Sequence, residues 1–177
     1  MPRNIDYTVP AEYEGRKVVH FLRGYCGYSA RLMRKVKFAL KLNGAQSRTI
    51  DRLKCGDILS VEIPDDDVLP EALNAEIDII YEDDDILVIN KSPFMAMHPT
   101  HNHQGDTLAN AVAAHLANKG KNAAFRAVGR LDKGTSGIVV CALNPLSACK
   151  LAGKIKKEYY ALVKGNLNGE GRVDVPI

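Results

Sequence analysis

The sequence of 177 residues predicts an α+β protein. Two helix-like segments near the N-terminus precede segments that show the two-residue alternation of half-buried strands. A second group of strand-like segments follows further along the chain, with an amphipathic helix among them. The composition, 46% hydrophobic and 25% charged, is that of an ordinary globular protein and argues against a disordered chain.

The charged residues divide the chain into three blocks. The net charge is +6 over residues 1–63, −10 over residues 64–90 and +7 over residues 91–177. Basic surfaces attract nucleic acid, although basic residues also serve simply to keep a domain in solution. We expect three parts with these boundaries: a first domain at 1–64, an acidic linker at 65–75 and a second domain at 76–177.

The first domain is expected to begin with two short helices. Residues 16–24 predict a helix that Gly24 closes. Ser29 is a suitable N-cap for a second helix, because its side chain can accept a hydrogen bond from a free backbone N–H. Three cations of that helix share one face and form a basic stripe. They are Arg31, Arg34 and Lys35.

Strand-like alternation follows at residues 38–42, and Asn43-Gly44 predicts a tight turn because both residues tolerate positive φ. A further strand at 58–63 ends at Pro64. In this order of elements, three motifs resemble the S4 RNA-binding domain over residues 14–63. They are Ser29-Ala30-Arg31, Leu42-Asn43-Gly44 and Leu53-Lys54-Cys55-Gly56-Asp57-Ile58. The resemblance implies a small α/β domain that binds RNA through Arg31, Arg34, Lys35 and Lys41.

In the second domain, residues 77–81 and 86–90 predict a hairpin whose turn contains the three aspartates at 83–85. Asp106 or Thr107 is expected to cap a helix with Leu108, Val112 and Leu116 on one face, ended by Gly120. An apolar strand is expected at 138–143, where Cys141 reads as a buried small side chain. Asn144-Pro145 then predicts the start of a further helix.

Metal and membrane roles find little support in the sequence. His98, His101 and His103 suggest a metal-dependent hydrolase as the weakest alternative, because no carboxylate or cysteine nearby completes the set. The four cysteines include no C-x-x-C pair, and no apolar run approaches the ~18 residues of a membrane span. We expect no metal, no membrane partner and a reducing cytoplasmic setting.

The most informative segment is 128–140, where a glycine-rich loop carries Arg130 and Asp132 ahead of an apolar strand. Thr135 and Ser136 are expected to hydrogen-bond the loop and to hold the Asp132 carboxylate in place. The segment matches neither the phosphate-binding P-loop nor the nucleophile elbow. A purely structural turn, in which Arg130 and Asp132 pair with backbone groups, stays open at this point.

Arg130-Leu131-Asp132, followed by Thr135-Ser136-Gly137, resembles the signature of the RNA pseudouridine synthases. Three upstream segments are similar to the RluA-like group: residues 85–93, 97–100 and 107–111. Gly129 departs from that group, which usually has His there, and is more similar to the RsuA-like branch. Residues 157–163 resemble a family strand in which Tyr159 occupies the tyrosine position.

The resemblance implies an enzyme that isomerises uridine to pseudouridine in RNA, with ribosomal RNA favoured over transfer RNA. It implies a mixed, mostly antiparallel-sheet catalytic domain, of which this chain holds the N-terminal part, and no cofactor. Asp132 is then the catalytic carboxylate, Tyr159 stacks on the uracil, and Arg130 contacts the substrate. Because the resembled domain continues with a basic partner for the aspartate, we expect residues 1–177 alone to be weakly active or inactive. The alternative is a non-catalytic RNA-binding protein that retains the synthase scaffold.

Overall fold

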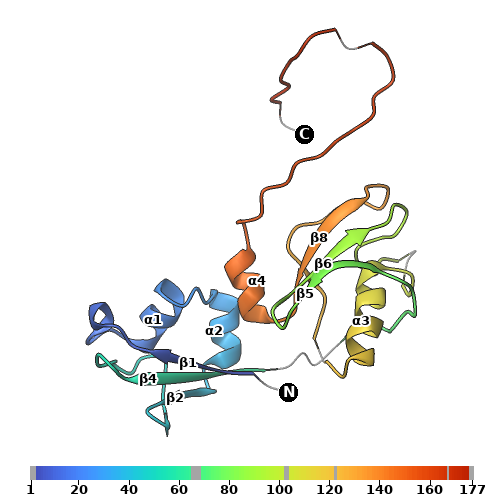
Figure 1. Cartoon of the computed structure of the whole chain (residues 1–177). Coiled ribbons are helices and arrows are strands. Elements are labelled where there is room, and N and C mark those ends of the chain that lie inside the picture. The colour runs from blue at the N-terminus through green and yellow to red at the C-terminus, as the bar shows by residue number, and fades with distance from the viewer. Residues whose placement is uncertain (1–2, 65–68, 102–103, 122, 167, 176–177) are drawn as a thin grey trace.

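The structure is a computed structural model that describes residues 3–64, 69–101, 104–121, 123–166 and 168–175. The chain forms two units, each with a four-stranded antiparallel sheet and its own apolar core (Figure 1). This arrangement confirms the α+β prediction and the antiparallel pairing expected for the second unit. The assignment of the first unit as an S4 domain stays a prediction.

The sheet of the first unit has the order β1-β4-β2-β3. Its strands are β1 Arg3–Thr8, β2 Leu40–Leu42, β3 Ala45–Gln46 and β4 Ile58–Ile63. Two helices, α1 Val18–Gly24 and α2 Ala30–Val36, pack on it after the 3₁₀ turn Ala11–Tyr13. Strand β1 was missed from the sequence although Ile5 and Tyr7 alternate with polar residues, because the segment is short and its partner, β4, lies far along the chain.

Local signals in this unit were mostly right. The Ser29 side chain accepts a hydrogen bond from the Leu32 backbone N–H (3.1 Å), as its N-cap role predicted. Asn43 and Gly44 both have positive φ, +49° and +82°, and join β2 to β3. The expected strand at 38–42 is too long, because a turn after α2 leaves Phe38 79% exposed and β2 begins at Leu40.

The segment that follows β4 has no helix or strand among its described residues, 69–77. It is nevertheless attached to the second unit through Asn110. The Asn110 side-chain amide donates to the Glu71 carbonyl (2.7 Å), and the Leu73 N–H donates to the Asn110 carbonyl (3.1 Å). The segment expected as an acidic linker is therefore partly packed against a helix, an outcome that needed tertiary contacts.

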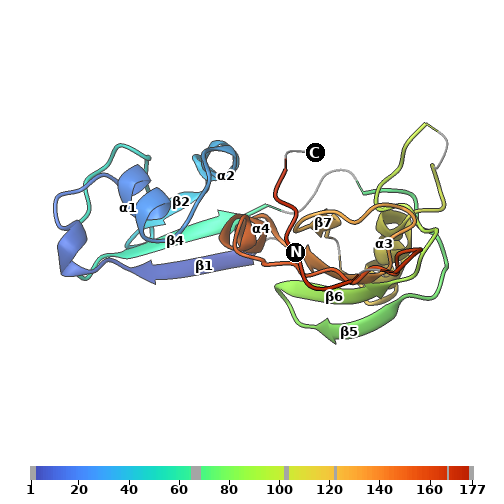
Figure 2. The ribbon, with the colours of Figure 1, turned by 90° about the horizontal axis from the view of Figure 1, so that it is seen from above.

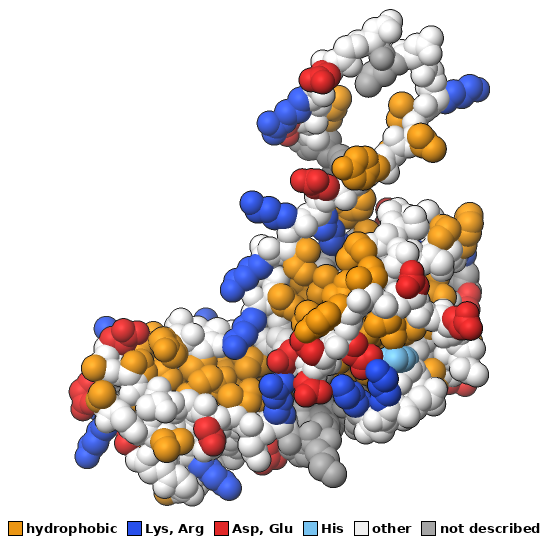
Figure 3. Space-filling view, in the orientation of Figure 1, with side chains coloured by type: hydrophobic (Ala, Val, Ile, Leu, Met, Phe, Trp, Pro, Cys, Tyr) orange, Lys and Arg blue, Asp and Glu red, His pale blue; other side chains and the backbone are white. Residues whose placement is uncertain are grey.

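The second sheet has the order β5-β6-β8-β7. Its elements are β5 Asp78–Glu82, β6 Ile86–Lys91, α3 Leu108–Asn118, β7 Arg126–Ala127, β8 Gly137–Ala142 and α4 Pro145–Leu151. The hairpin at Asp83–Asp85 and the caps at Thr107 and Asn144 form as predicted, and Cys141 is fully buried. Figure 3 shows apolar side chains gathered on one face of this unit. Among its large apolar residues, Ile80 and Ile138 are more than half exposed.

Helix α4 joins the two units, and it lies between α2 and β7 when the molecule is seen from above (Figure 2). Leu146 of this helix is buried in the core of the first unit. The Cys149 thiol donates to the Ser29 hydroxyl (3.1 Å) across the junction. Asp85 adds a polar link, because its carboxylate accepts hydrogen bonds from Arg3 of β1 as well as from the start of α4.

The chain beyond α4 contains no helix or strand among its described residues, so the strand expected at 157–163 is not formed. In Figure 1 this part leaves α4 and ends in a loop that stands apart from both sheets. A strand needs a neighbour that accepts and donates its backbone hydrogen bonds. None of the described strands pairs with residues 157–163, and this explains why local β-propensity did not produce one.

Candidate active site

The loop that carries Asp132 connects two neighbouring strands of the second sheet, β7 and β8. The Val128 N–H donates to the Val140 carbonyl (2.7 Å) at one end, and Gly137, with φ +121°, begins β8 at the other. Leu131, next to the aspartate, is buried in the core. Both ends of the loop and its centre are therefore anchored, while Asp132 itself is exposed.

The Asp132 carboxylate makes no hydrogen bond or ion pair with any residue that the structure describes. The expectation that Thr135 and Ser136 hold the carboxylate was wrong, because the hydrogen bond that forms joins backbone atoms. The Thr135 backbone N–H instead donates to the backbone carbonyl of Asp132 (3.1 Å), so the turn orders the main chain and leaves the acid group accessible. An accessible carboxylate on an ordered loop can act as a nucleophile or a general base.

Lys91, at the end of β6, supports this loop from beneath. Its side chain is 1% exposed, and its ammonium group donates to three carbonyl oxygens, those of Ser92 (3.0 Å), Met95 (3.0 Å) and Lys133 (3.2 Å). The Lys133 carbonyl also accepts the Phe94 N–H (2.8 Å). Burial lowers the pKa of Lys91, which measures the cost of placing an ammonium group in the protein interior.

Lys91 is the residue of this site that sequence reasoning missed. It appeared only inside a motif that resembles the synthase family, with no role of its own. A lysine that follows an apolar strand was the available signal, since lysine is seldom fully buried unless its charge is partnered. The burial itself could not be read from the sequence because the carbonyl of Lys133 lies 42 residues away along the chain.

Gly129 has φ +85°, a conformation that strains residues with a side chain. A Cβ atom at this position would lie 2.9 Å from the Lys157 ammonium nitrogen. That ammonium donates to the Arg130 carbonyl (3.3 Å), next to the glycine. In this chain, therefore, the glycine at 129 has a local physical reason: it permits the turn and leaves room for Lys157.

Tyr159 is brought to the same side of the sheet as the loop. A groove of about 730 Å³ is lined by the loop and strand residues from Gly134 to Ile138 and, opposite them, by residues 155–160. Tyr159 belongs to this second wall and is 62% exposed, so its ring is available to a ligand. Leu131 also lines the groove, whereas neither Arg130 nor Asp132 is among its lining residues.

His98 lies close to Arg130 and packs on Phe125, with ring centroids 5.2 Å apart. Burial, and secondarily the nearby positive charge of Arg130, lowers the pKa of His98. The imidazole is therefore favoured in its neutral form near Asp132's loop. Arg130 is exposed, and its backbone rather than its guanidinium accounts for its contact with Lys157.

The histidines considered as metal ligands do not form a metal site with other side chains that the structure describes. No group of three metal-ligating side chains is found in the described ranges, and His103 lies outside them. His115 bonds to Glu82 (2.8 Å) and links α3 to β5. Likewise, within the described part, no helix is long and apolar enough to cross a membrane.

The cations expected to bind RNA are all exposed. Arg31, Arg34 and Lys35 lie along α2 as one stripe, whereas Lys41 lies on β2, a different element.

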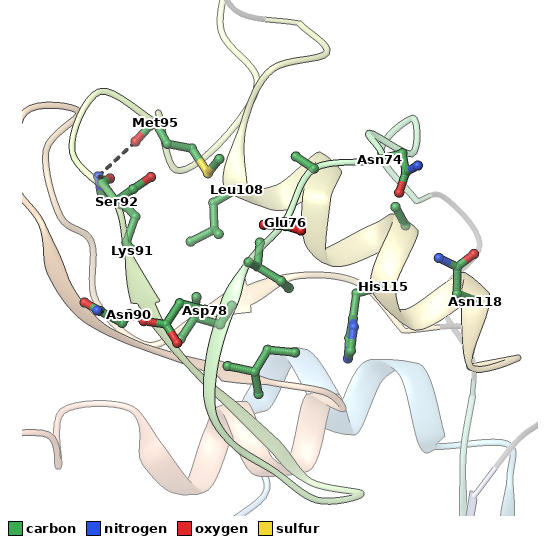
Figure 4. Close-up of a pocket in the computed structure, with 15 residues that line it drawn as sticks. Asn74, Glu76, Asp78, Asn90, Lys91, Ser92, Met95, Leu108, His115 and Asn118 are labelled. Carbon is green, nitrogen blue, oxygen red and sulfur yellow. Dashed lines mark hydrogen bonds between the residues drawn. The ribbon is translucent and has the colours of Figure 1, made fainter.

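A further cavity, of about 610 Å³, lies between residues 74–79 and α3, and Lys91 is among its lining residues (Figure 4). His115 and Asn118 of α3 face it, and the bond from Lys91 to the Met95 carbonyl forms part of its wall. None of its lining residues belongs to the loop of Asp132. This cavity is therefore not part of the candidate site.

Comparison with known proteins identifies the family of this chain. Residues 85–177, just over half of the chain, match the family model described as RNA pseudouridylate synthase. The chain belongs to this family. The matched region begins at Asp85 of the β5–β6 hairpin and includes the Asp132 loop, Lys91 and Tyr159.

Individual relatives agree with this membership. A Bacillus subtilis protein, YjbO, described as an uncharacterised RNA pseudouridine synthase, is 38% identical over 87% of this chain and 58% of its own length. An Aquifex aeolicus protein with the same kind of description is 34% identical over 98% of this chain and 58% of its own length. The ribosomal large subunit pseudouridine synthase D of Vibrio vulnificus is 35% identical over 69% of this chain and 39% of its own length. The chain thus spans about half the length of these relatives.

Proposed function

We propose that the protein isomerises specific uridines to pseudouridine in RNA, with Asp132 as the catalytic carboxylate. The observation that carries this proposal is the exposed Asp132, whose carboxylate has no partner among the described residues, on a loop anchored by two strands and by Lys91. Membership of the pseudouridine synthase family supports the reaction class. The similarity to a ribosomal large subunit synthase favours ribosomal RNA over transfer RNA as the substrate.

The proposed reaction breaks the N1–C1′ glycosidic bond of a uridine, turns the uracil and forms a C5–C1′ bond. The proton on C5 is released, and N1 gains a proton, so no electron is transferred and no phosphate moves. Asp132 takes part as a nucleophile or a general base on the nucleoside. Because the isomerisation transfers no electrons and no phosphate, it calls for no redox cofactor and no ATP.

The target nucleotide must leave its stack to reach the carboxylate, at a cost of a few kcal/mol. In the proposed complex, Tyr159 stacks on the uracil and offsets part of this cost. Arg130 contacts the substrate, by holding a phosphate or by filling the space that the base leaves. The unit at 1–64 acts as an S4-like RNA-binding domain through Arg31, Arg34, Lys35 and Lys41, and the segment 65–75 connects it to the catalytic domain.

The test is tritium release from RNA labelled at uridine C5, since isomerisation frees the C5 hydrogen. Both the 177-residue chain and the full open reading frame that encodes it would be assayed on ribosomal and transfer RNA transcripts. Asp132→Asn should abolish release while the fold and RNA affinity are kept. Asp84→Asn, an exposed carboxylate of the same unit, is the matched control and should retain activity.

Two results would overturn the proposal. Release at the wild-type rate by Asp132→Asn would remove Asp132 from the chemistry. RNA binding without release by any form of the protein, on either class of RNA, would favour a non-catalytic RNA-binding protein that retains the synthase scaffold.

A further inference from the structure

A second groove, of about 430 Å³, lies where the two units meet. Three parts of the chain form its walls: α2, the segment that leads into β7, and α4. Figure 2 shows α2, α4 and β7 side by side at this junction. Its lining residues are Ser29, Arg31, Leu32, Lys35, Ala124, Arg126, Pro145, Ala148 and Cys149.

The charged side chains that line this groove are all cations. They are Arg31, Lys35 and Arg126, and no carboxylate lines the groove among the residues that the structure describes. Arg31 and Lys35 are four residues apart on α2, so they project from one face in successive turns. Arg126 lines the same groove from β7, in the other unit. Cations dispersed merely to keep a protein in solution would not need to converge on one hollow from two units.

The groove also has apolar lining residues, with Leu32 from α2 and Pro145 and Ala148 from α4. Apolar side chains do not compete for the hydrogen bonds of the cations. A polyanion that lies along the groove would therefore be contacted by the three charged groups from its two sides. The guanidinium groups suit phosphate oxygens because they offer several donors in a planar fork.

The two walls are held in place by contacts across the junction. The Cys149 thiol bonds to the Ser29 hydroxyl, and both residues line the groove. Leu146 of α4 is buried in the first unit's core. Asp85 accepts hydrogen bonds from Arg3 of the first unit and from Asn144 (2.7 Å) and Ser147 (2.9 Å) at the start of α4. The spacing of the cations is thus set by packing, before any ligand arrives.

We propose that this groove binds the phosphate backbone of the RNA substrate, and that Arg126 completes a phosphate site begun by Arg31 and Lys35. The proposal rests on the proposed function for the identity of the polyanion. It adds a binding residue in the second unit. Arg126 lies on β7, the strand that leads into the Asp132 loop, so a phosphate held there positions the RNA relative to the reacting carboxylate.

The first experiment measures the affinity of the 177-residue chain for a fluorescein-labelled RNA hairpin, by anisotropy, across a series of salt concentrations. Arg126→Gln and Lys35→Gln should each weaken binding about five- to tenfold. Each should also reduce the slope of log K against log salt by roughly 0.7–0.9, as expected for the loss of one phosphate contact. Arg23→Gln, an exposed cation on α1 outside the groove, is the charge-matched control and should change neither quantity.

If Arg23→Gln and Arg126→Gln weakened RNA binding equally, the proposal that the groove binds RNA would be overturned, because net charge alone would then explain the effect. Unchanged affinity in Arg126→Gln would overturn it as well. Thermal unfolding monitored by circular dichroism accompanies each variant, and Arg126→Lys, which keeps the charge, should recover most of the affinity. If Arg126→Gln does not fold, Ala148→Glu, which places a carboxylate in the groove from α4, decides the question with the same readouts: weaker binding is expected, and unchanged affinity would overturn the proposal.

Tritium release separates this proposal from the proposed function. If Asp132→Asn abolishes release but Arg126→Gln binds RNA normally, the groove is wrong and the catalytic assignment stands. If the RNA hairpin binds through the groove but no form of the protein releases tritium, the groove stands and the catalytic assignment is wrong.

Discussion

The loop that carries Asp132 and the segment that carries Tyr159 are held in opposite ways. The loop is short, both of its ends enter strands of one sheet, and the buried Lys91 binds the carbonyl beside the aspartate. The segment of Tyr159 has no strand partner among the described residues, and its ring is 62% exposed. The proposed reactive group is therefore placed before RNA arrives, whereas the proposed stacking group depends on contacts with its ligand.

This difference between the Asp132 loop and the Tyr159 segment indicates which part of the proposed active site needs a rigid scaffold. A carboxylate acts at a single atom, and an error of about 1 Å in its position can cost on the order of 100-fold in rate. An aromatic face tolerates more displacement, because stacking has no single contact point and accepts any base. Changes at the anchors should therefore affect both stability and rate, and changes at Tyr159 should affect rate alone.

The largest effect is expected for Lys91→Met, which removes the donor to three carbonyls. The unfolding free energy should fall by about 3 kcal/mol, because the carbonyls of the Asp132 loop would be left without their charged donor. Urea denaturation measures the loss. Lys54→Met, an exposed lysine of the first unit, is the control. A Lys91→Met protein as stable as the wild type would show that the ammonium group is dispensable to the loop.

The next largest effect is expected for Tyr159→Ala, which tests the exposed segment that carries the proposed stacking residue. Loss of base stacking is worth about 1–3 kcal/mol, so kcat/KM for tritium release should fall roughly 5- to 150-fold. The midpoint of thermal unfolding should stay unchanged, because the ring is mostly exposed. Tyr159→Phe keeps the aromatic face and should retain most of the rate. An equal fall of kcat/KM in both variants would instead show that the Tyr159 hydroxyl, and not its aromatic face, is what the reaction needs.

A smaller effect is expected for Gly129→Ala in the anchored loop. Its φ of +85° strains any residue with a Cβ atom, and the new atom would displace the Lys157 side chain. The expected loss of unfolding free energy is about 1–2 kcal/mol. Gly134→Ala is the matched control, since it lacks positive φ and its Cβ would meet nothing within 4 Å. Equal stability of the two variants would mean that the turn at 129 relaxes without cost.

The smallest effect concerns pH and the junction at Asp85. Burial opposes ionisation of this carboxyl, but hydrogen bonds from Arg3, Asn144 and Ser147 outweigh it and lower the pKa of Asp85 below the ordinary 3.8. A lowered pKa means that ionised Asp85 stabilises the folded state above about pH 5. This contribution is lost as the pH falls through the folded-state pKa.

Unfolding free energy measured from pH 6 down to pH 2.5 checks this expectation. Asp85→Asn should reduce stability by about 1 kcal/mol at pH 6, with a difference from wild type that shrinks in acid. Glu82, whose pKa is lowered too, contributes to the acid slope of both proteins, so only their difference reports on Asp85. A difference that stays constant with pH would show that charge at Asp85 is not what stabilises the junction.

Elements with strong local signals could be predicted from the sequence. Ser29, Asn43-Gly44, Thr107 and Asn144-Pro145 each occupy the cap or turn that their side chains favour. The hairpin around Asp83–Asp85 also follows from local chemistry, since the Asp83 carboxylate accepts the backbone N–H groups of Asp85 and Ile86 (both 2.7 Å). These features were readable because every partner lies within a few residues.

Features that depend on distant partners were missed or misjudged. β1 pairs with a strand more than 50 residues away, and the expected strand at 157–163 finds no partner among the described residues. Phe38 fitted the alternation of a strand, yet the end of α2 turned it outward. Strand formation depends on the neighbour as much as on the residue, so sequence patterns alone overestimate some strands and overlook others.

The sequence by itself determined the α+β class, the caps and turns, and the motif that led to Asp132 and to the synthase family. Only the tertiary structure decided that Lys91 is buried against the loop, that Gly129 makes room for Lys157, and that Arg126 lines one groove with Arg31 and Lys35. The physical reason is the range of the interactions. Caps and turns bond within a few residues, whereas burial and the convergence of charges depend on which distant segments the core brings together.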